Sequence, residues 1–228
     1  MSGGRSRAWL WGAVGVVVVA AGIVAAVVSA GGGGSTSSSG HGHAGGTVEI
    51  ASRVTVQGAP LPTLPDSGSD PAVGRAAPTL VGVTFSGAPL TVTDTGQPFA
   101  VVFVAHWCPH CQAEVPRMVA LARSGQIPVP VVGVATGTDP AAPNYPPSAW
   151  LAREHWPFPV LVDTSHATAA TAYGLPAYPF LVFVDAHGAV AGRLSGEIAA
   201  SDLAKVFAAL GAGRPLPIPG TPGASSGR

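Results

Sequence analysis

The chain has 228 residues, enough for one domain with extensions at its ends. Its 11 basic and 11 acidic residues cancel and charged residues make up only 10% of the chain, which excludes the strongly basic class of nucleic-acid-binding proteins. Hydrophobic residues, at 47%, are ample for a core. Two cysteines are too few for a disulfide scaffold, and their close spacing indicates redox or metal chemistry.

The N-terminal region predicts a membrane-spanning helix. An uncharged apolar run over 8–30 follows Arg5 and Arg7. About twenty apolar residues span a bilayer as a helix, and flanking arginines stay on the cytoplasmic side. We therefore expect residues 1–30 to be a single-pass signal anchor in the cell membrane, with the remaining chain on the extracytoplasmic side. A cleaved signal peptide ending at 28–30 is the alternative and gives a secreted protein.

Low-complexity segments flank the expected domain. Residues 31–46 are rich in Gly and Ser, which is typical of a flexible linker. We expect 31–73 to be this linker with a peripheral segment, 74–211 to be the folded domain, and 212–228, rich in Gly, Pro and Ser, to be a disordered tail.

The first predicted elements are strands. Alternating residues predict a peripheral strand over 47–56, and strands over 81–85 and 89–93 form a hairpin that precedes the core. Apolar runs then predict core strands over 99–105, 129–135, 158–163 and 180–185. A partner strand over 190–195 follows a tight turn at 187–188, so the last two strands are antiparallel.

Helices alternate with these strands. They are predicted over 112–123 with Pro116 inside, over 148–155, over 167–173 with Gly174 at the end, and over 201–210 with Ser201 as N-cap. This alternation predicts an α/β fold, in which helices cover both faces of a central mixed sheet.

Both cysteines, Cys108 and Cys111, lie between an apolar strand and a helix. A helix start favours an anion, which lowers the pKa of a thiol placed there. The thiolate attacks disulfides, and a second thiol three residues on can resolve the mixed disulfide. We therefore predict a thiol–disulfide oxidoreductase in which Cys108 attacks and Cys111 resolves, with no cofactor.

Three segments carry a resemblance to a known family. They are Ala77-Pro78, the stretch 107–116 (Trp-Cys-Pro-His-Cys-Gln-Ala-Glu-Val-Pro), and the stretch 173–179, which ends in Tyr-Pro before an apolar strand. Over 74–210 the chain resembles the thioredoxin superfamily, and most of all its membrane-anchored TlpA/ResA-type branch. The resemblance implies a thioredoxin-like fold with an extra N-terminal hairpin. It also implies protein thiols and disulfides as substrates, and a membrane or extracytoplasmic redox partner that resets the active site.

The resemblance also implies substrate-binding residues. Pro179 corresponds to the cis-proline that lies against the cysteine pair, where its missing N–H leaves room for a sulfur or a substrate backbone. Tyr178 would then offer backbone groups to an extended substrate segment. Trp107, beside Cys108, can shape the same surface.

One position departs from the family. Many relatives carry a buried polar or acidic residue six positions before the first cysteine, where it relays a proton to the resolving thiol. That position is Val102 here. Deprotonation of Cys111 then depends on water or on Glu114 as a possible proton relay. The alternative for Glu114 is an acid of the first helical turn, stabilised by the helix dipole.

The direction of the reaction depends on the dipeptide between the cysteines. Pro109-His110 matches the pair of DsbA-type oxidases, and a histidine there stabilises the Cys108 thiolate, which makes the disulfide more oxidising. His106 either adds to this effect or is a solvated loop histidine. The sequence thus favours oxidation or exchange. The alternative is TlpA/ResA-like reduction, as in cytochrome c maturation.

A function of another class is a copper- or zinc-binding module. Cys108, Cys111 and His110 offer suitable ligand atoms. No further ligand can be placed by its spacing in the sequence, so we expect no metal site.

Overall fold

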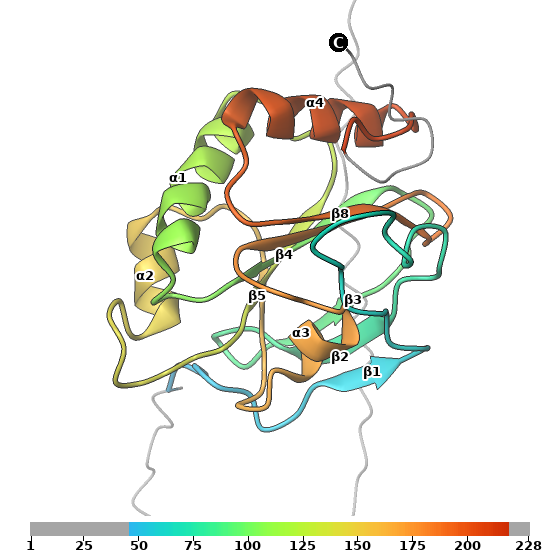
Figure 1. The fold of residues 1–228 in the computed structure, drawn as a ribbon. Coiled ribbons are helices and arrows are strands. Elements are labelled where there is room, and N and C mark those ends of the chain that lie inside the picture. The colour runs from blue at the N-terminus through green and yellow to red at the C-terminus, as the bar shows by residue number, and fades with distance from the viewer. Residues whose placement is uncertain (1–45, 219–228) are drawn as a thin grey trace, which may run out of the picture. The chain divides into compact units, whose positions relative to one another are not determined.

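The computed structural model describes residues 46–218 (Figure 1). The predicted membrane anchor, 1–30, lies outside the described residues, as do most of the Gly/Ser-rich segment and residues 219–228. Within 46–218, no helix is both long enough and apolar enough to cross a membrane.

A five-stranded sheet forms the centre of the domain, with the strand order β6-β5-β4-β7-β8. Its strands are β4 (Phe99–Val104), β5 (Val131–Ala135), β6 (Val160–Val162), β7 (Phe180–Val184) and β8 (Val190–Ser195). Strand β4 pairs in parallel with β5 and antiparallel with β7, and β7 pairs antiparallel with β8. The prediction of a mixed sheet is therefore confirmed.

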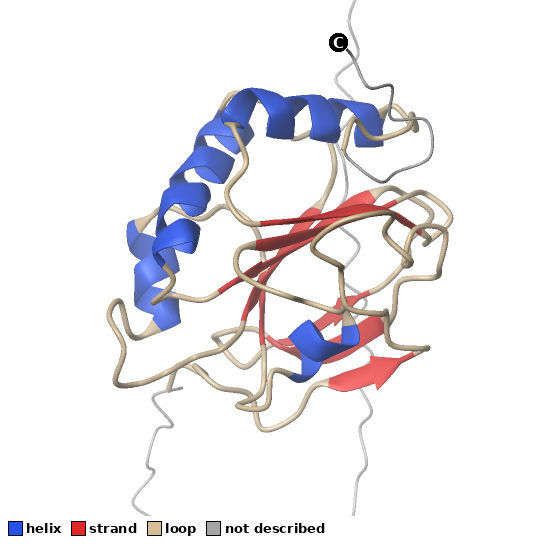
Figure 2. Cartoon of the chain, viewed as in Figure 1, coloured by secondary structure: helices blue, strands red, loops and turns tan. Residues whose placement is uncertain are grey.

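Helices and a second sheet cover the two faces of this central sheet (Figures 1 and 2). The helices are α1 (Pro109–Arg123), α2 (Pro147–Arg153), α3 (Thr168–Ala172) and α4 (Ala200–Gly211). Successive side chains of a strand point to opposite faces, so Val102 of β4 packs with α1, α2 and α4, while Val101 and Phe103 pack with α3 and the smaller sheet. Strand β4 is buried on both faces, as its continuous apolar sequence predicts.

The smaller sheet contains β1 (Thr55–Gln57), β2 (Thr79–Val83) and β3 (Pro89–Val92) in that order, all antiparallel. The predicted hairpin is confirmed as β2 and β3. The predicted strand over 47–56 is wrong except at its end. Its first part bonds to separate elements, because the Val48 N–H donates to the Phe85 carbonyl and the Ala51 N–H to that of Asp163.

The segment before β2 packs onto the domain, although we expected a linker with a peripheral segment up to residue 73. Asp70 accepts hydrogen bonds from two nitrogens of Arg193 in β8, one of them the Nε at 2.9 Å. A third nitrogen of Arg193 donates to the carbonyls of Pro62, at 2.8 Å, and Tyr173, at 2.9 Å. Both side chains of the ion pair are almost completely buried. The pair therefore fastens the segment to the central sheet.

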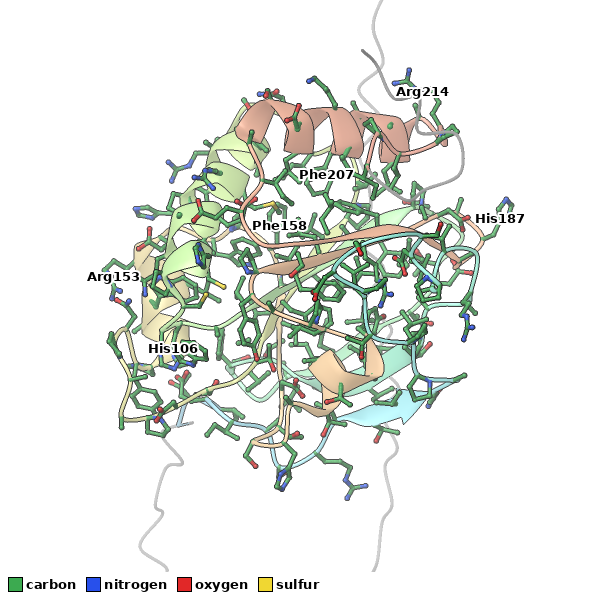
Figure 3. All side chains as sticks on the ribbon, in the orientation of Figure 1. His106, Arg153, Phe158, His187, Phe207 and Arg214 are labelled. Atoms are coloured by element: carbon green, nitrogen blue, oxygen red, sulfur yellow. The ribbon has the colours of Figure 1, made fainter. Side chains whose placement is uncertain are left out.

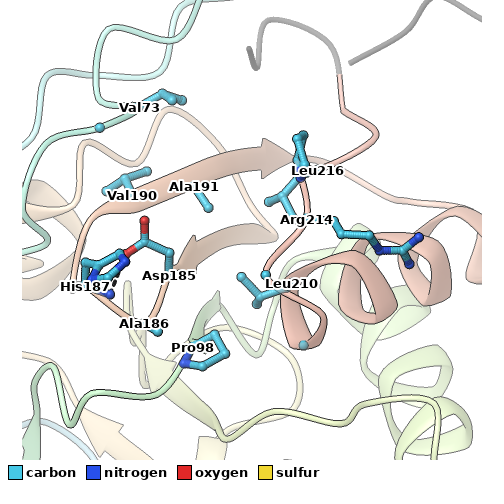
Figure 4. Close-up of a pocket in the computed structure, with 14 residues that line it drawn as sticks. Val73, Pro98, Asp185, Ala186, His187, Val190, Ala191, Leu210, Arg214 and Leu216 are labelled. Atoms are coloured by element: carbon cyan, nitrogen blue, oxygen red, sulfur yellow. Dashed lines mark hydrogen bonds between the residues drawn. The ribbon is translucent and has the colours of Figure 1, made fainter. Parts of the chain in front are cut away.

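The C-terminal helix differs from its prediction at both ends. Helix α4 begins at Ala200 after Ala199 as N-cap, with no side-chain cap, so the prediction of Ser201 as N-cap is wrong. Beyond the helix, Leu216 and Ile218 are buried in the core, although we expected a disordered tail from residue 212. Leu216 lines a pocket together with Leu210, Pro98 and Val190 (Figure 4), and no cysteine lines that pocket.

Candidate active site

Helix α1 begins at Pro109, three residues earlier than predicted, because proline is well suited to the first turn of a helix. Cys108 is the N-cap residue, with an extended backbone at φ −75° and ψ 120°. Cys111 therefore lies in the first turn. The free backbone N–H groups and the positive dipole end of the helix are next to the cysteine pair.

The Cys108 thiol lies against the segment that precedes β7. Both cysteines are free thiols, and the Cys108 sulfur is 3.9 Å from the Tyr178 carbonyl oxygen. The peptide bond between Tyr178 and Pro179 is cis, so this feature of the predicted cis-proline is confirmed. The fold thus brings together two segments that are seventy residues apart in the sequence.

The Cys111 thiol is completely buried, although a resolving cysteine must lose its proton readily. Its sulfur accepts a hydrogen bond from the Ala105 N–H at 3.4 Å, and Val102 belongs to the same apolar cluster. Burial raises the pKa of the Cys111 thiol far above its usual value; the nearby Cys108 and Glu114 add to this effect, while the bond from Ala105 opposes it. Cys111 therefore needs a base to become a thiolate.

Glu114 lies one turn after Cys111 and is also buried, with 1% of its side chain exposed. One carboxylate oxygen accepts hydrogen bonds from Arg117, at 3.0 Å, and from the Ile198 N–H, at 3.2 Å. The other oxygen has no partner among the described residues. Burial raises the pKa of this carboxyl. The alternative of a first-turn acid is wrong, because the first turn of α1 contains no acidic residue.

His110 is exposed and is bound by a residue that the sequence did not indicate. Its Nδ1 donates to the Glu197 carboxylate at 2.7 Å, and the other oxygen of Glu197 accepts from Arg117 at 2.8 Å. Hydrogen bonds from His110, which has the larger effect, and from Arg117 lower the pKa of Glu197. Glu197 follows β8 by two residues, and no spacing or motif in the sequence connects it to a helix start 87 residues earlier.

Trp107 and Tyr178 lie beside each other next to Cys108. Their rings form an edge-to-face pair with centroids 5.8 Å apart, and the Trp107 Nε1–H donates to the Gly137 carbonyl at 2.7 Å. A Cβ atom at Gly137 would lie only 2.7 Å from the Tyr178 hydroxyl, so this position has no room for a larger residue. The two aromatic residues and Gly137 therefore form one wall beside the cysteine.

His106, which is labelled in Figure 3, binds the loop between β5 and α2. Its Nδ1–H donates to the Pro143 carbonyl at 2.7 Å, and its Nε2 accepts from the Asp139 N–H at 3.2 Å. The ring is buried, so the alternative of a solvated histidine is wrong. Both ring nitrogens bind the loop, and His106 is therefore a support for the site.

The alternative of a metal-binding module lacks a set of ligands in the described part of the chain. No group of three His, Cys, Asp or Glu side chains within 46–218 is arranged to hold a metal ion. The Nδ1 atom of His110, one of the proposed ligands, is bound to Glu197.

The comparisons with known proteins agree with this geometry. A family model described as Redoxin matches residues 72–210. The chain belongs to the Redoxin family. It is a thiol–disulfide oxidoreductase of the thioredoxin superfamily, and its fold is thioredoxin-like.

Two curated relatives illustrate this Redoxin membership. The chain is 30% identical over 146 residues to the thiol:disulfide interchange protein DsbE homolog of Paracoccus denitrificans, which covers 63% of this chain and 77% of the relative. It is also 30% identical over 145 residues to the soluble secreted antigen MPT53 of Mycobacterium tuberculosis, with coverages of 64% and 78%. The crystal structure of an uncharacterized conserved protein from Geobacillus kaustophilus matches 72% of this chain and 89% of its own, with a TM-score of 0.53 at 18% identity, which shows a shared fold.

Proposed function

We propose that this Redoxin-family enzyme exchanges disulfides with secreted or membrane proteins outside the cytoplasm, with Cys108 as the attacking and Cys111 as the resolving cysteine. The observation that carries the proposal is the difference between the two thiols. Cys108 is the N-cap residue of α1, faces the Tyr178 carbonyl and keeps 6% of its surface exposed, whereas Cys111 has none exposed. This difference supports Cys108 as the sulfur that meets a substrate.

In the oxidising direction, a substrate thiolate attacks the Cys108 sulfur of the Cys108–Cys111 disulfide. Cys111 leaves as a thiolate and takes up a proton. A second substrate thiolate then attacks the substrate sulfur of the mixed disulfide and releases Cys108 as a thiolate, which the start of α1 stabilises. The enzyme gains two electrons, and the substrate loses two and acquires a disulfide. A membrane or extracytoplasmic redox partner then reoxidises the enzyme.

The buried side chain of Glu114 is our proposed proton relay for Cys111. Val102 supplies no base on the sheet side, and the surroundings of Cys111 disfavour its thiolate. Glu114 lies one turn along the same helix, and its raised pKa suits a group that both accepts and returns a proton. The oxygen of Glu114 that has no partner within residues 46–218 is free to take that proton.

The substrate-binding surface consists of Trp107, Tyr178 and Pro179. The Tyr178 carbonyl and the adjoining cis peptide present main-chain groups beside the Cys108 sulfur. An extended substrate segment can pair with such groups without dependence on its sequence, while the Trp107 and Tyr178 rings contact its side chains. This arrangement suits an enzyme with many protein substrates.

Oxidation or exchange is the direction that we propose. Pro109-His110 is the dipeptide of DsbA-type oxidases, and the Glu197 carboxylate is placed to stabilise a positive charge on His110 beside Cys108. A cation there stabilises the thiolate and so makes the disulfide a stronger oxidant.

Equilibration with glutathione tests this direction. We expect a reduction potential less negative than the roughly −270 mV of thioredoxin. A value at or below that of thioredoxin would instead support TlpA/ResA-like reduction. Replacement of His110 by Ala is expected to move the potential in the reducing direction, and a variant with an unchanged potential would remove the tuning role of this residue.

The proposed location is the cell membrane, with residues 1–30 as the anchor and the thioredoxin-like domain, 74–211, on the extracytoplasmic side. The charge-free run over 8–30 supports this location. The name of the mycobacterial relative, a secreted antigen, supports the extracytoplasmic side. Fractionation of cells that express the full chain separates an anchored protein from one released by cleavage.

A further inference from the structure

Four ionisable side chains form a hydrogen-bonded line beside the cysteine pair. His110, Glu114 and Arg117 are spaced i, i+4 and i+7 and therefore share one side of α1. The loop between β8 and α4 crosses this side, and its Glu197 binds His110 at 2.7 Å and Arg117 at 2.8 Å. Arg117 in turn donates to Glu114 at 3.0 Å.

Glu197 holds the centre of this line. It divides its two oxygens between His110 and Arg117, the two side chains that face it from α1, with Glu114 behind Arg117. Its pKa is lowered, first by His110, so it is ionised at neutral pH.

We infer that Glu197 is a positioning residue of the active site that acts on Cys108 through His110. It holds the imidazole by Nδ1 and stabilises a positive charge on this ring, which occupies the second position of α1 between the two cysteines. That charge adds to the positive end of the helix and favours the Cys108 thiolate. The inference rests on the proposed role of Cys108 as the attacking residue.

The side chains of His110 and Glu197 are exposed enough that Glu197 can be replaced with little effect on folding. The side chains of His110 and Glu197 are 65% and 35% exposed. Ion pairs at such positions contribute little to folding, typically below about 1 kcal/mol. A change of Glu197 can therefore alter the cysteine without unfolding the domain.

The substitution Glu197→Gln removes the charge and keeps the size of the side chain. We expect the reduced variant to react with iodoacetamide at Cys108 on the order of threefold to tenfold more slowly between about pH 6 and 7, because the thiolate fraction falls. Cys111 has no exposed surface, so we expect a single adduct at Cys108, and mass spectrometry of the peptides assigns the rate to it. The matched control is Asp202→Asn, which removes an equal charge from the exposed Asp202–Lys205 pair on α4 and is expected to leave the rate unchanged.

A double-mutant cycle separates positioning from other effects. In a chain that carries His110→Ala, Glu197→Gln is expected to cause no further change in the alkylation rate. An equal slowing in that background, or no slowing in the parent chain, would overturn the inference. The proposed function is tested separately. Disulfide exchange that persists in a chain carrying Cys108→Ser would contradict the proposed function, whatever the outcome for Glu197.

Discussion

At the scale of single residues, the two thiols of the cysteine pair differ in their access to the surface, with 6% of Cys108 and none of Cys111 exposed. Both residues belong to the same apolar cluster, but Cys108 lies beside the Tyr178 carbonyl, whereas Cys111 packs among apolar side chains such as Val102. The burial that protects Cys111 from outside disulfides also disfavours its thiolate. The difference between the two thiols supports our proposal that Cys108 meets the substrate and Cys111 carries out the internal step.

The buried Cys111 thiol predicts a loss of stability at alkaline pH. Its folded pKa is raised, so above about pH 8.5 the unfolded chain loses a proton that the folded chain retains. The free energy of unfolding of the reduced protein should fall by about 1.4 kcal/mol for each pH unit from there. Urea titrations between about pH 8.5 and 10 measure the free energy of unfolding, and the Cys111→Ser variant should lack this decrease with pH. Parallel curves for the two proteins would show that Cys111 is not disfavoured as a thiolate.

The buried Glu114 carboxyl predicts a slower internal step in its amide variant. Glu114→Gln keeps an acceptor for Arg117 and the Ile198 N–H but cannot exchange a proton with Cys111. We expect attack of Cys111 on a mixed disulfide at Cys108 to slow by about a hundredfold. Rapid-mixing kinetics with a preformed mixed disulfide measure this step. The rate of Cys108 attack on a substrate disulfide serves as the internal control, and slowing of both steps alike would mean that Glu114 is only structural.

At the scale of elements, the sequence predicted the features that depend only on neighbouring residues. The apolar runs of β4 and β7 and the two cysteines at a helix start follow directly from the residues involved. The short β1 did not, because it depends on which distant groups satisfy the backbone, and neither did the starts of α1 and α4, where no side-chain cap marks the first turn. Residues 47–54, for example, alternate like a strand but bond to separate elements.

The ion pair of Asp70 with Arg193 predicts that the stability of the domain depends strongly on the contact between the segment before β2 and strand β8. Asp70→Ala leaves the Arg193 charge buried without its partner, which costs about 3–5 kcal/mol. Urea unfolding measures the loss. Asp202→Ala, which breaks the exposed pair with Lys205, is the matched control and should cost less than about 1 kcal/mol. Equal losses in the two variants would show that the segment before β2 is not fastened by this pair.

At the scale of the whole molecule, the active site is assembled from segments that the sequence keeps far apart. The cysteine pair and Pro179 could be predicted, because each carries a recognisable local pattern. Glu197 could not, because it meets His110 across 87 positions, and neither could the anchoring of Asp70 by Arg193 across 123. Acidic residues in loops have no pattern of their own, so only the fold shows which of them reach the site.

The most direct test of the central claim, that Cys108 attacks and Cys111 resolves, is the trapping of mixed disulfides in cells that express the full chain. Cys111→Ser should accumulate extracytoplasmic proteins linked to the enzyme through Cys108, because Cys108 can still attack substrate disulfides while the internal attack by Cys111 that releases them is lost. Mass spectrometry of the linked peptides identifies the cysteine. Cys108→Ser should trap none. Complexes linked through Cys111 in the Cys108→Ser variant, or none in Cys111→Ser, would contradict the account.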